Sequence, residues 1–231
     1  MTRPDIGFSV VDLSTKFNCG KGQDLRRAMR LVEKVRHEEA TVFLPALEDI
    51  EGWKLVLYTD ASLGSLSGGT GSSAGYVLFV TDGSGHRSVC LAWGSSKIKR
   101  VVAATLSAEI LAMQKGLEET VHVREMCKDM LGKDFAGMPL VVLTDNQSAV
   151  ESIYNDTMVT EKRLLRDLAV IKEMVERKEI RRVAWVPAEE MLADALTKYG
   201  VDGKSLLKCV REGTLECNYL CENTGQRGPW L

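Results

Sequence analysis

Two carboxylates of this chain each follow directly on a short apolar run. Residues 55–59 (LVLYT) end at Asp60, and residues 140–144 (LVVLT) end at Asp145. Each run is typical of a buried strand, and open α/β sheets place their ligands at the carboxyl ends of such strands. We therefore expect both carboxylates at one edge of a sheet, where acids from separate strands can bind divalent metal ions.

A third acid, Glu109, lies in a strongly helical stretch. It comes three residues after Leu106 and four before Met113, so it shares the buried edge of the helix rather than the solvated face. An unpaired carboxylate there is costly, and we expect a cation to neutralise it or burial to raise its pKa. From position alone, Glu109 could equally be a helix-edge glutamate that turns toward solvent.

The fourth acid, Asp194, stands near the start of a late helix, where acidic residues are common. Taken singly, Asp60 and Asp145 could also be turn residues or helix N-caps, and Asp145 especially so because Asn146 begins a helix directly after it. Only the set of four, offered to one region by two strands and two helices, favours a metal site. That set is Asp60, Glu109, Asp145 and Asp194.

The composition is that of an ordinary globular chain. Its 231 residues (25.5 kDa) are 45% hydrophobic and 27% charged, enough for one well-packed domain with appendages. The formal net charge is −2, so a polyanionic partner must be bound by local basic patches. No apolar stretch reaches the ~20 residues of a membrane span, and residues 1–5 lack a signal-peptide pattern. We expect no membrane partner and an intracellular location, cytoplasmic or nuclear.

The six cysteines are scattered and form no CxxC pair, and the last histidine is His122. Cys209, Cys217 and Cys221 therefore have no nearby partner to complete a four-ligand zinc site. We favour reduced thiols over structural zinc.

Apolar periodicity and turn residues predict the elements that must position the acids. Strands are expected at 54–60, 74–81, 87–93, 140–144 and 180–186, with a short one at 41–44 and a glycine-rich loop at 63–73. Helices are expected at 23–39, from Leu106 to a C-cap at Gly132, around Val150 and Ile153, from Leu164 to Val175, and from about Glu189. This order predicts an α/β fold, a mixed sheet with helices packed on it. The tail, with Leu206, Leu207 and Val210 on one side, is either a helix that docks on the sheet or an interface for another subunit.

Five short motifs occur in order along the chain. They are LYTDAS at 57–62, WGSSK at 93–97, SAE at 107–109, TDNQSA at 144–149 and VPAEEMLADALTK at 186–198. This succession closely resembles the ribonuclease H domain of copia-type LTR retrotransposon polyproteins. The RPDI run at 3–6 and the basic helix after it resemble the segment that joins the reverse transcriptase to that domain.

The resemblance implies a ribonuclease H-like fold, with a five-stranded mixed sheet and helices on both faces. It divides the chain into a connection segment (1–52), a ribonuclease H-like domain (53–200) and a C-terminal helix and tail (201–231). The paired-aspartate motif of the polymerase is absent, so we expect no DNA synthesis. The resemblance implies as partners an RNA–DNA hybrid and the reverse transcriptase of the same polyprotein, with virus-like particles as one cytoplasmic setting.

The implied reaction is hydrolysis of the RNA strand of the hybrid. Two Mg²⁺ ions, about 4 Å apart, would activate a water and stabilise the leaving 3′ oxygen. Asp60 would bridge both ions, and Glu109 would hold one ion and sense the 2′-hydroxyl that DNA lacks. Asp145 and Asp194 would complete the coordination shells. Such oxygen-rich ligands suit Mg²⁺ or Mn²⁺ rather than zinc.

Two departures from the family pattern are visible. Many ribonucleases H carry a histidine in the loop before the last aspartate, thought to assist product release, whereas residues 180–194 contain none. Turnover would then be slow, or Glu189 or Glu190 would substitute. Copia-type relatives usually show a Lys-His-Ile-Asp run near the penultimate helix, where this chain has EKRLL at 161–165.

Candidate contacts for the hybrid lie near the acids in the sequence. The glycine-rich loop offers bare backbone N–H groups to phosphate, and basic side chains before the helix of Glu109 offer charge. Asn146 and Gln147, beside Asp145, are placed to touch minor-groove edges. The predicted substrate-binding residues are Ser62, Gly64, Lys97, Lys99, Arg100, Asn146 and Gln147. Each basic residue could instead belong to an ordinary solvated face. Trp53, Trp93 and Trp185 fall in or beside strands and are expected in the core.

Two other functions stay open. A catalytically silent ribonuclease H-like module could bind nucleic acid or tether a polymerase, although retention of four acids argues against it. A DNA-cutting relative, such as an integrase or resolvase, usually places three acids differently and lacks three strands before the acidic helix.

Overall fold

Five strands form one mixed sheet in the computed structural model, which describes residues 3–38, 41–66, 69, 71–84, 86–132, 137–155 and 161–220. The strands are β1 (Lys54–Leu66), β2 (Gly71–Thr81), β3 (Ser88–Lys97), β4 (Leu140–Thr144) and β5 (Arg182–Trp185), in the order β3-β2-β1-β4-β5. The first three strands pair antiparallel, whereas β1 with β4 and β4 with β5 pair parallel. The α/β class and the five-stranded mixed sheet are therefore confirmed.

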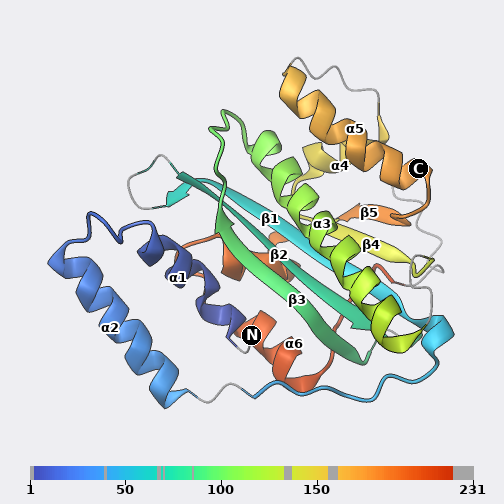
Figure 1. Cartoon of the computed structure of the whole chain (residues 1–231), viewed down its shortest axis with the longest axis horizontal. Helices are drawn as coiled ribbons and strands as arrows, with labels where there is room; N and C mark the ends of the chain where they lie inside the picture. Colours follow the sequence, from blue (N-terminus) through green and yellow to red (C-terminus); the bar gives the residue numbers. More distant parts are fainter. Residues whose placement is uncertain are drawn as a thin grey trace.

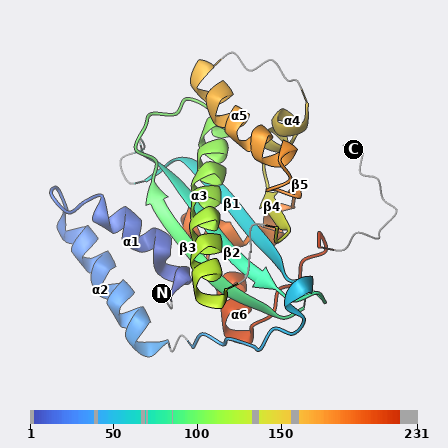
Figure 2. The ribbon, with the colours of Figure 1, turned by 45° about the vertical axis from the view of Figure 1, so that its right-hand side comes forward.

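Helices cover both faces of this sheet, as predicted (Figure 1). The α-helices are α1 (Gly7–Ser14), α2 (Gly22–His37), α3 (Thr105–Leu131), α4 (Gln147–Tyr154), α5 (Lys162–Glu176) and α6 (Lys204–Glu212), and the 3-10 turns are η1 (Pro4–Ile6), η2 (Ile50–Gly52), η3 (Ala188–Glu190) and η4 (Leu192–Leu196). One core cluster joins α3, α4 and α5 to the sheet, and Figure 2 shows α3 running across that face. A second cluster joins η4 and α6 to the opposite face.

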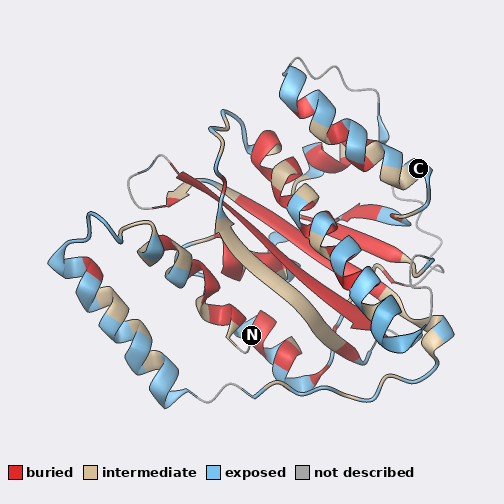
Figure 3. Cartoon of the chain, in the orientation of Figure 1, coloured by how far each residue is buried: buried red, intermediate tan, exposed pale blue. Residues whose placement is uncertain are grey.

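The sheet is buried because both faces carry apolar side chains. Every residue of β2 is buried, and so is every residue of β4 (Figure 3). Alternation along β1 sends Leu55 and Leu57 to the α3 side, and Val56 and Tyr58 to the η4 side. The apolar pattern thus determines which face of the sheet each side chain of a strand occupies, and it also determines the position of the residues that follow.

The hairpin of β1 and β2 is longer than predicted. A loop was expected at 63–73, but β1 continues to Leu66 and β2 begins at Gly71. The pairing shifts register between Ser62 and Leu66, and Gly64 adopts a left-handed conformation (φ +66°), so the strand bulges instead of ending. Residues 67, 68 and 70 of the predicted loop lie outside the described residues.

Two further element predictions are wrong. Residues 41–44 form no strand; the Phe43 amide donates to the Val210 carbonyl of α6 at 3.1 Å, so this segment runs beside a helix instead of a sheet edge. The helix expected from Glu189 is a pair of 3-10 turns, η3 and η4. Met191 between them has an extended backbone (φ −78°, ψ 93°), which interrupts helical hydrogen bonding.

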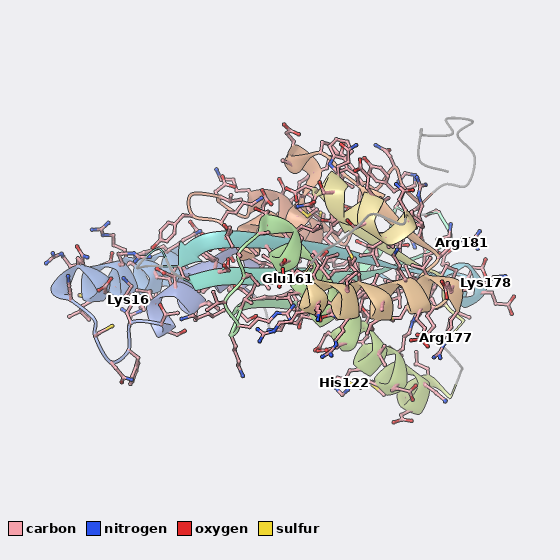
Figure 4. The ribbon with its side chains drawn as sticks, turned by 90° about the horizontal axis from the view of Figure 1, so that it is seen from above. Lys16, His122, Glu161, Arg177, Lys178 and Arg181 are labelled. Carbon is pink, nitrogen blue, oxygen red and sulfur yellow. The ribbon has the colours of Figure 1, made fainter. Side chains whose placement is uncertain are left out.

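The tail helix and the N-terminal helices both pack on the sheet domain. In α6, Leu206, Leu207 and Val210 are buried, so this helix docks on the sheet. Asp12 of α1 is fully buried and accepts hydrogen bonds from Arg27 of α2 at 2.8 Å and from the Tyr199 hydroxyl at 2.9 Å. Lys16, in the turn after α1, lies at the opposite end of the molecule from Lys178 in the turn before β5 (Figure 4). The domain boundaries stay predictions.

Among the described helices, none combines the length and the apolar character that crossing a bilayer requires.

Candidate metal centre

Asp60 and Asp145 emerge side by side because β1 and β4 are parallel neighbours. Tyr58 pairs with Leu143, and each aspartate follows its member of that pair by two residues. Asp60 also shares the sheet face of Tyr58, which is the face covered by η4. The N-cap of the following helix α4 is Asn146, whose side chain accepts from the Ala149 amide at 2.9 Å. The Asp145 carboxylate is therefore not used as the cap.

Asp194 reaches the same edge on η4, which presses closely against β2. Gly75 stands opposite Asp60 in the β1–β2 register, and a Cβ there would lie 2.7 Å from Leu196 Cβ and 2.8 Å from Thr197 Cγ2. Only glycine allows η4 this close. Two side chains of the sheet also hold the backbone of this segment, since Ser95 donates to the Leu196 carbonyl at 2.6 Å and Ser73 to that of Thr197 at 2.9 Å.

The three aspartates form one group of carboxylate oxygens. One oxygen each from Asp60, Asp145 and Asp194 lies within 4.8 Å of the others, and Asp60 is fully buried. The partly buried Asp145 and Asp194 leave the group open on one side. A buried carboxylate flanked by two accessible ones is an arrangement that can hold a cation while a second molecule approaches it.

Glu109 adds a fourth carboxylate beside this group, from the α3 side. It is 3% exposed, and a backbone hydrogen bond from Ala61 reaches its carboxylate. The start of its helix is tied to α5, because Ser107 Oγ donates to Glu161 Oε2 at 2.8 Å; Glu161 is labelled in Figure 4. The structure therefore places Glu109 in the protein interior and not on the solvated helix face.

Two side chains that follow Asp194 contact the acids directly. The Thr197 hydroxyl donates to Asp60 Oδ2, and this bond holds the carboxylate in one orientation. Lys198 Nζ lies 2.7 Å from Asp194 Oδ1, 3.3 Å from Asp60 Oδ1 and 3.4 Å from Asp145 Oδ2. A single ammonium thus bridges all three aspartates.

Burial dominates the electrostatics of the site. It raises the pKa of Asp60 to about 7, against the opposing effects of Lys198 and Thr197. It raises the pKa of Glu109 to about 9, and the charges of Asp60 and Asp145 add to this rise. The pKa of Asp194 is also raised by burial. Burial would lower the pKa of Lys198, but the three carboxylates outweigh it and raise that pKa above its usual range.

The donor set fits a hard divalent cation. Asp60 Oδ1 and Glu109 Oε2 are buried and accept no hydrogen bond, so each keeps lone pairs for a ligand. All the candidate donors are carboxylate oxygens, which Mg²⁺ and Mn²⁺ prefer, and the chain's last histidine, His122, is exposed on α3 (Figure 4). A zinc-type nitrogen or sulfur ligand is absent from the described acid group.

Four of the predicted substrate-binding residues lie beyond Asp60 on the hairpin and its neighbour. Ser62, Ser73 and Lys97 form one row across β1, β2 and β3, two residues past the row that contains Asp60. Lys97 and Lys99 are exposed, and the Gly64 amide donates to Ser72 Oγ at 3.3 Å. These positions flank the acid group on the β3 side.

The other three predicted residues already have partners in the protein. Arg100 forms an ion pair with Asp167 of α5, and Asn146 caps α4 through its side-chain oxygen. Gln147 is exposed and donates to Glu151 Oε1 at 2.9 Å. Arg100 is thus directed toward α5, whereas the Asn146 and Gln147 side chains stay beside Asp145.

Three residues of this site were given no role by the sequence analysis. Thr197 and Lys198 lie within the last motif, and their spacing of three and four from Asp194 on a presumed helix is the only signal that could have placed them. Trp185 was expected in the core, which is wrong: it is 46% exposed, and its indole N–H donates to the Asp145 carbonyl at 3.0 Å. It ends the short edge strand β5.

No protein-family model and no curated protein sequence matches the chain. Among solved structures, it is similar to the N-terminal RNase H domain of a Mycobacterium tuberculosis protein, with 25% identity, a TM-score of 0.44, and coverage of 67% of this chain and 95% of that one. It is similar to LC11-RNase H1, isolated from compost, with 24% identity, a TM-score of 0.45, and coverage of 66% and 98%. The protease–reverse transcriptase of prototype foamy virus is 17% identical, with a TM-score of 0.40, and is matched over 86% of this chain and 28% of its own length. All three TM-scores are low, so we infer no activity from them.

Proposed function

We propose that this chain is a metal-dependent endoribonuclease that hydrolyses the RNA strand of RNA–DNA hybrids. One observation carries the proposal: three aspartates converge to within 4.8 Å just past the last residue pair of the parallel strands β1 and β4, with the buried Glu109 beside them. Burying so many acids together is costly unless a cation or a substrate makes use of them. The five motifs that resemble copia-type ribonuclease H domains contain these same four acids.

Asp60, Asp145, Asp194 and Glu109 would hold two Mg²⁺ ions, for which Mn²⁺ can substitute. Such ions, when bound, activate a water and stabilise the leaving oxygen of a phosphodiester. The protein's own contribution is orientation: Thr197 fixes the Asp60 carboxylate, and the Trp185 indole holds the backbone of Asp145. Burial of Glu109 keeps bulk water from its side of the site.

The hybrid would lie over the open side of the acid group. Exposed Lys97 and Lys99 flank that side and would contact phosphates, and the exposed Gln147 lies next to Asp145. Glu109 would distinguish RNA from DNA by accepting a hydrogen bond from a 2′-hydroxyl. Ser62, Gly64, Arg100 and Asn146 remain candidates for the edges of this surface.

We also propose that the chain works in reverse transcription of a copia-type retroelement, inside the cell and beside the polymerase of its own polyprotein. Helix α2 supports a protein partner: Leu25, Met29 and Val32 are 65%, 57% and 50% exposed on one side of it. On its other side, Arg27 and Lys34 make ion pairs with Asp12 and Asp5. The helix is therefore attached to the domain through its charges and presents its apolar side outward.

The test compares wild type with Asp145→Asn on labelled substrates in the presence of Mg²⁺. We expect cleavage of the RNA strand of a hybrid, no cleavage of duplex DNA, and a loss of rate of about a hundredfold or more in the variant, which removes one ligand charge. Asp129→Asn, an exposed change on α3, serves as the matched control and should leave the rate unchanged. Cutting of duplex DNA instead would point to an integrase-like activity.

A catalytically silent module is the second candidate, and the position of Lys198 favours it. Three ion pairs to one ammonium neutralise much of the charge that a metal needs. If wild type and Asp145→Asn bound the hybrid equally and neither cleaved it in Mg²⁺ or Mn²⁺, the silent module would be the correct function.

A further inference from the structure

Lys198 is the only cation that the described residues place among the acids, and its three ion pairs involve one oxygen of each aspartate. Asp60 Oδ1 is buried, accepts no hydrogen bond and has this ammonium at 3.3 Å. The ammonium therefore lies where a divalent ion would need to bind. An ion that coordinated these three oxygens would occupy the space that the ammonium fills, so the two cannot bind the aspartates at the same time.

Hydrogen bonds fix the backbone of Lys198, but they do not fix the conformation of its side chain. The amides of Thr197 and Lys198 both donate to the Asp194 carbonyl, at 3.1 and 2.9 Å, and this turn returns Lys198 over Asp194. The side chain keeps 31% of its surface exposed, so it can rotate into solvent without any movement of the fold. The Lys198 ammonium therefore binds the three aspartates but can leave them when its side chain rotates.

We propose that Lys198 is a built-in competitor for the divalent metal, and that a metal ion binds to Asp60, Asp145 and Asp194 only as the Lys198 ammonium leaves them. This inference rests on the metal site of the proposed function. Removal of the ammonium should tighten metal binding and leave the metal-free site electrostatically repulsive, because three carboxylates would then lie close together without a counter-charge. Lys198 thus sets the metal concentration at which the site fills.

The competition predicts a measurable change in affinity with no nucleic acid present. Mn²⁺ binding to the whole chain would be followed by calorimetry and by electron paramagnetic resonance for wild type, Lys198→Gln and Lys198→Arg. We expect Lys198→Gln to bind Mn²⁺ about tenfold more tightly, which corresponds to ~1.4 kcal/mol. Lys198→Arg keeps the charge and should bind no more tightly than wild type. Lys204→Gln is the control, since Lys204 is exposed and pairs with Asp202.

Wild type offers a second readout that needs no variant. Acylation of lysine amines, located by mass spectrometry, should label Lys198 slowly in the metal-free protein and faster when Mn²⁺ is added, with labelling of Lys204 unchanged. The inference would be overturned if wild type and Lys198→Gln bound Mn²⁺ with equal affinity, or if the rate of Lys198 labelling did not change with Mn²⁺. The proposed metal site would not be affected by either result. Failure of both proteins to bind Mn²⁺ would overturn the inference and the proposed metal site together.

Discussion

Replacing Glu109 by glutamine should stabilise the metal-free protein, and should do so only at neutral and alkaline pH. Glu109 is 3% exposed, and its Oε2 accepts no hydrogen bond. Burial, with the charges of Asp60 and Asp145, raises its pKa from 4.5 to about 9. The folded protein therefore holds a proton on Glu109 at pH values where the unfolded chain has released it.

The sign and the size of the effect follow from that difference. Stability contributed by Glu109 is complete below pH 4.5 and is lost progressively as the pH rises toward about 9. Each pH unit above 4.5 costs ~1.4 kcal/mol, so at pH 8 the cost reaches ~5 kcal/mol at most. Burying a glutamine amide without a hydrogen-bond partner costs ~1–2 kcal/mol, and this cost offsets part of the stability gained by removing the carboxyl group. The net expectation for Glu109→Gln is a gain of ~3 kcal/mol at pH 8 and a loss of ~1 kcal/mol at pH 5, where the glutamine penalty exceeds the gain.

The assay is urea unfolding of wild type and Glu109→Gln in EDTA at both pH values. Glu118→Gln, an exposed change on the same helix, is the matched control and should follow wild type. If the free energies of unfolding of wild type and Glu109→Gln fell in parallel between pH 5 and pH 8, Glu109 would not carry a raised pKa. The reasoning about its burial beside Asp60 would then be refuted.

Three other changes test the packing of the fold and the proposed ligand role of Asp60. Gly75→Ala places a Cβ 2.7 Å from Leu196 Cβ, so the variant should lose ~1–3 kcal/mol of stability in thermal unfolding. It should also cleave the hybrid more slowly, because Asp194 is displaced. Unchanged stability and rate would contradict the close packing. Arg124→Met removes bonds to the Met138 and Glu179 carbonyls (2.7 and 3.2 Å) and should lower the free energy of unfolding by ~1–3 kcal/mol in urea, with the metal affinity unchanged. Addition of Mg²⁺ should raise the melting temperature of wild type but not that of Asp60→Asn, because only the folded wild type holds the ion; an equal rise in both would show that Asp60 is not a ligand.

The positions of Asp60 and Asp145 could be predicted because local sequence determines them. The apolar runs 55–59 and 140–144 form parallel neighbours β1 and β4, and strand β4 has the predicted bounds. Asp60 and Asp145 follow the paired residues Tyr58 and Leu143 by the same offset of two, so they must lie side by side. Helical spacing placed Glu109 at the edge of the buried helix face but left open whether its side chain turned to solvent, and the structure shows that it is buried.

Asp194 was among the predicted acids, but the way it reaches the site and the contacts of Lys198 could not be predicted, because tertiary contacts determine them. Asp194 lies on a 3-10 turn, whose approach to the sheet depends on the absence of a side chain at Gly75. Lys198 reaches all three aspartates only because this turn bends back on Asp194. The extension of β1 to Leu66 depends on a bulge at Gly64, and a glycine-rich segment looks like a loop when its pairing partner is unknown.

The most direct test of the metal centre is a crystal grown with Mn²⁺ and measured at the manganese absorption edge. We expect anomalous peaks among the carboxylates of Asp60, Asp145, Asp194 and Glu109, with the Lys198 ammonium turned away from them. A map without such peaks at saturating Mn²⁺, in which Lys198 still bridges the three aspartates, would contradict the proposed function.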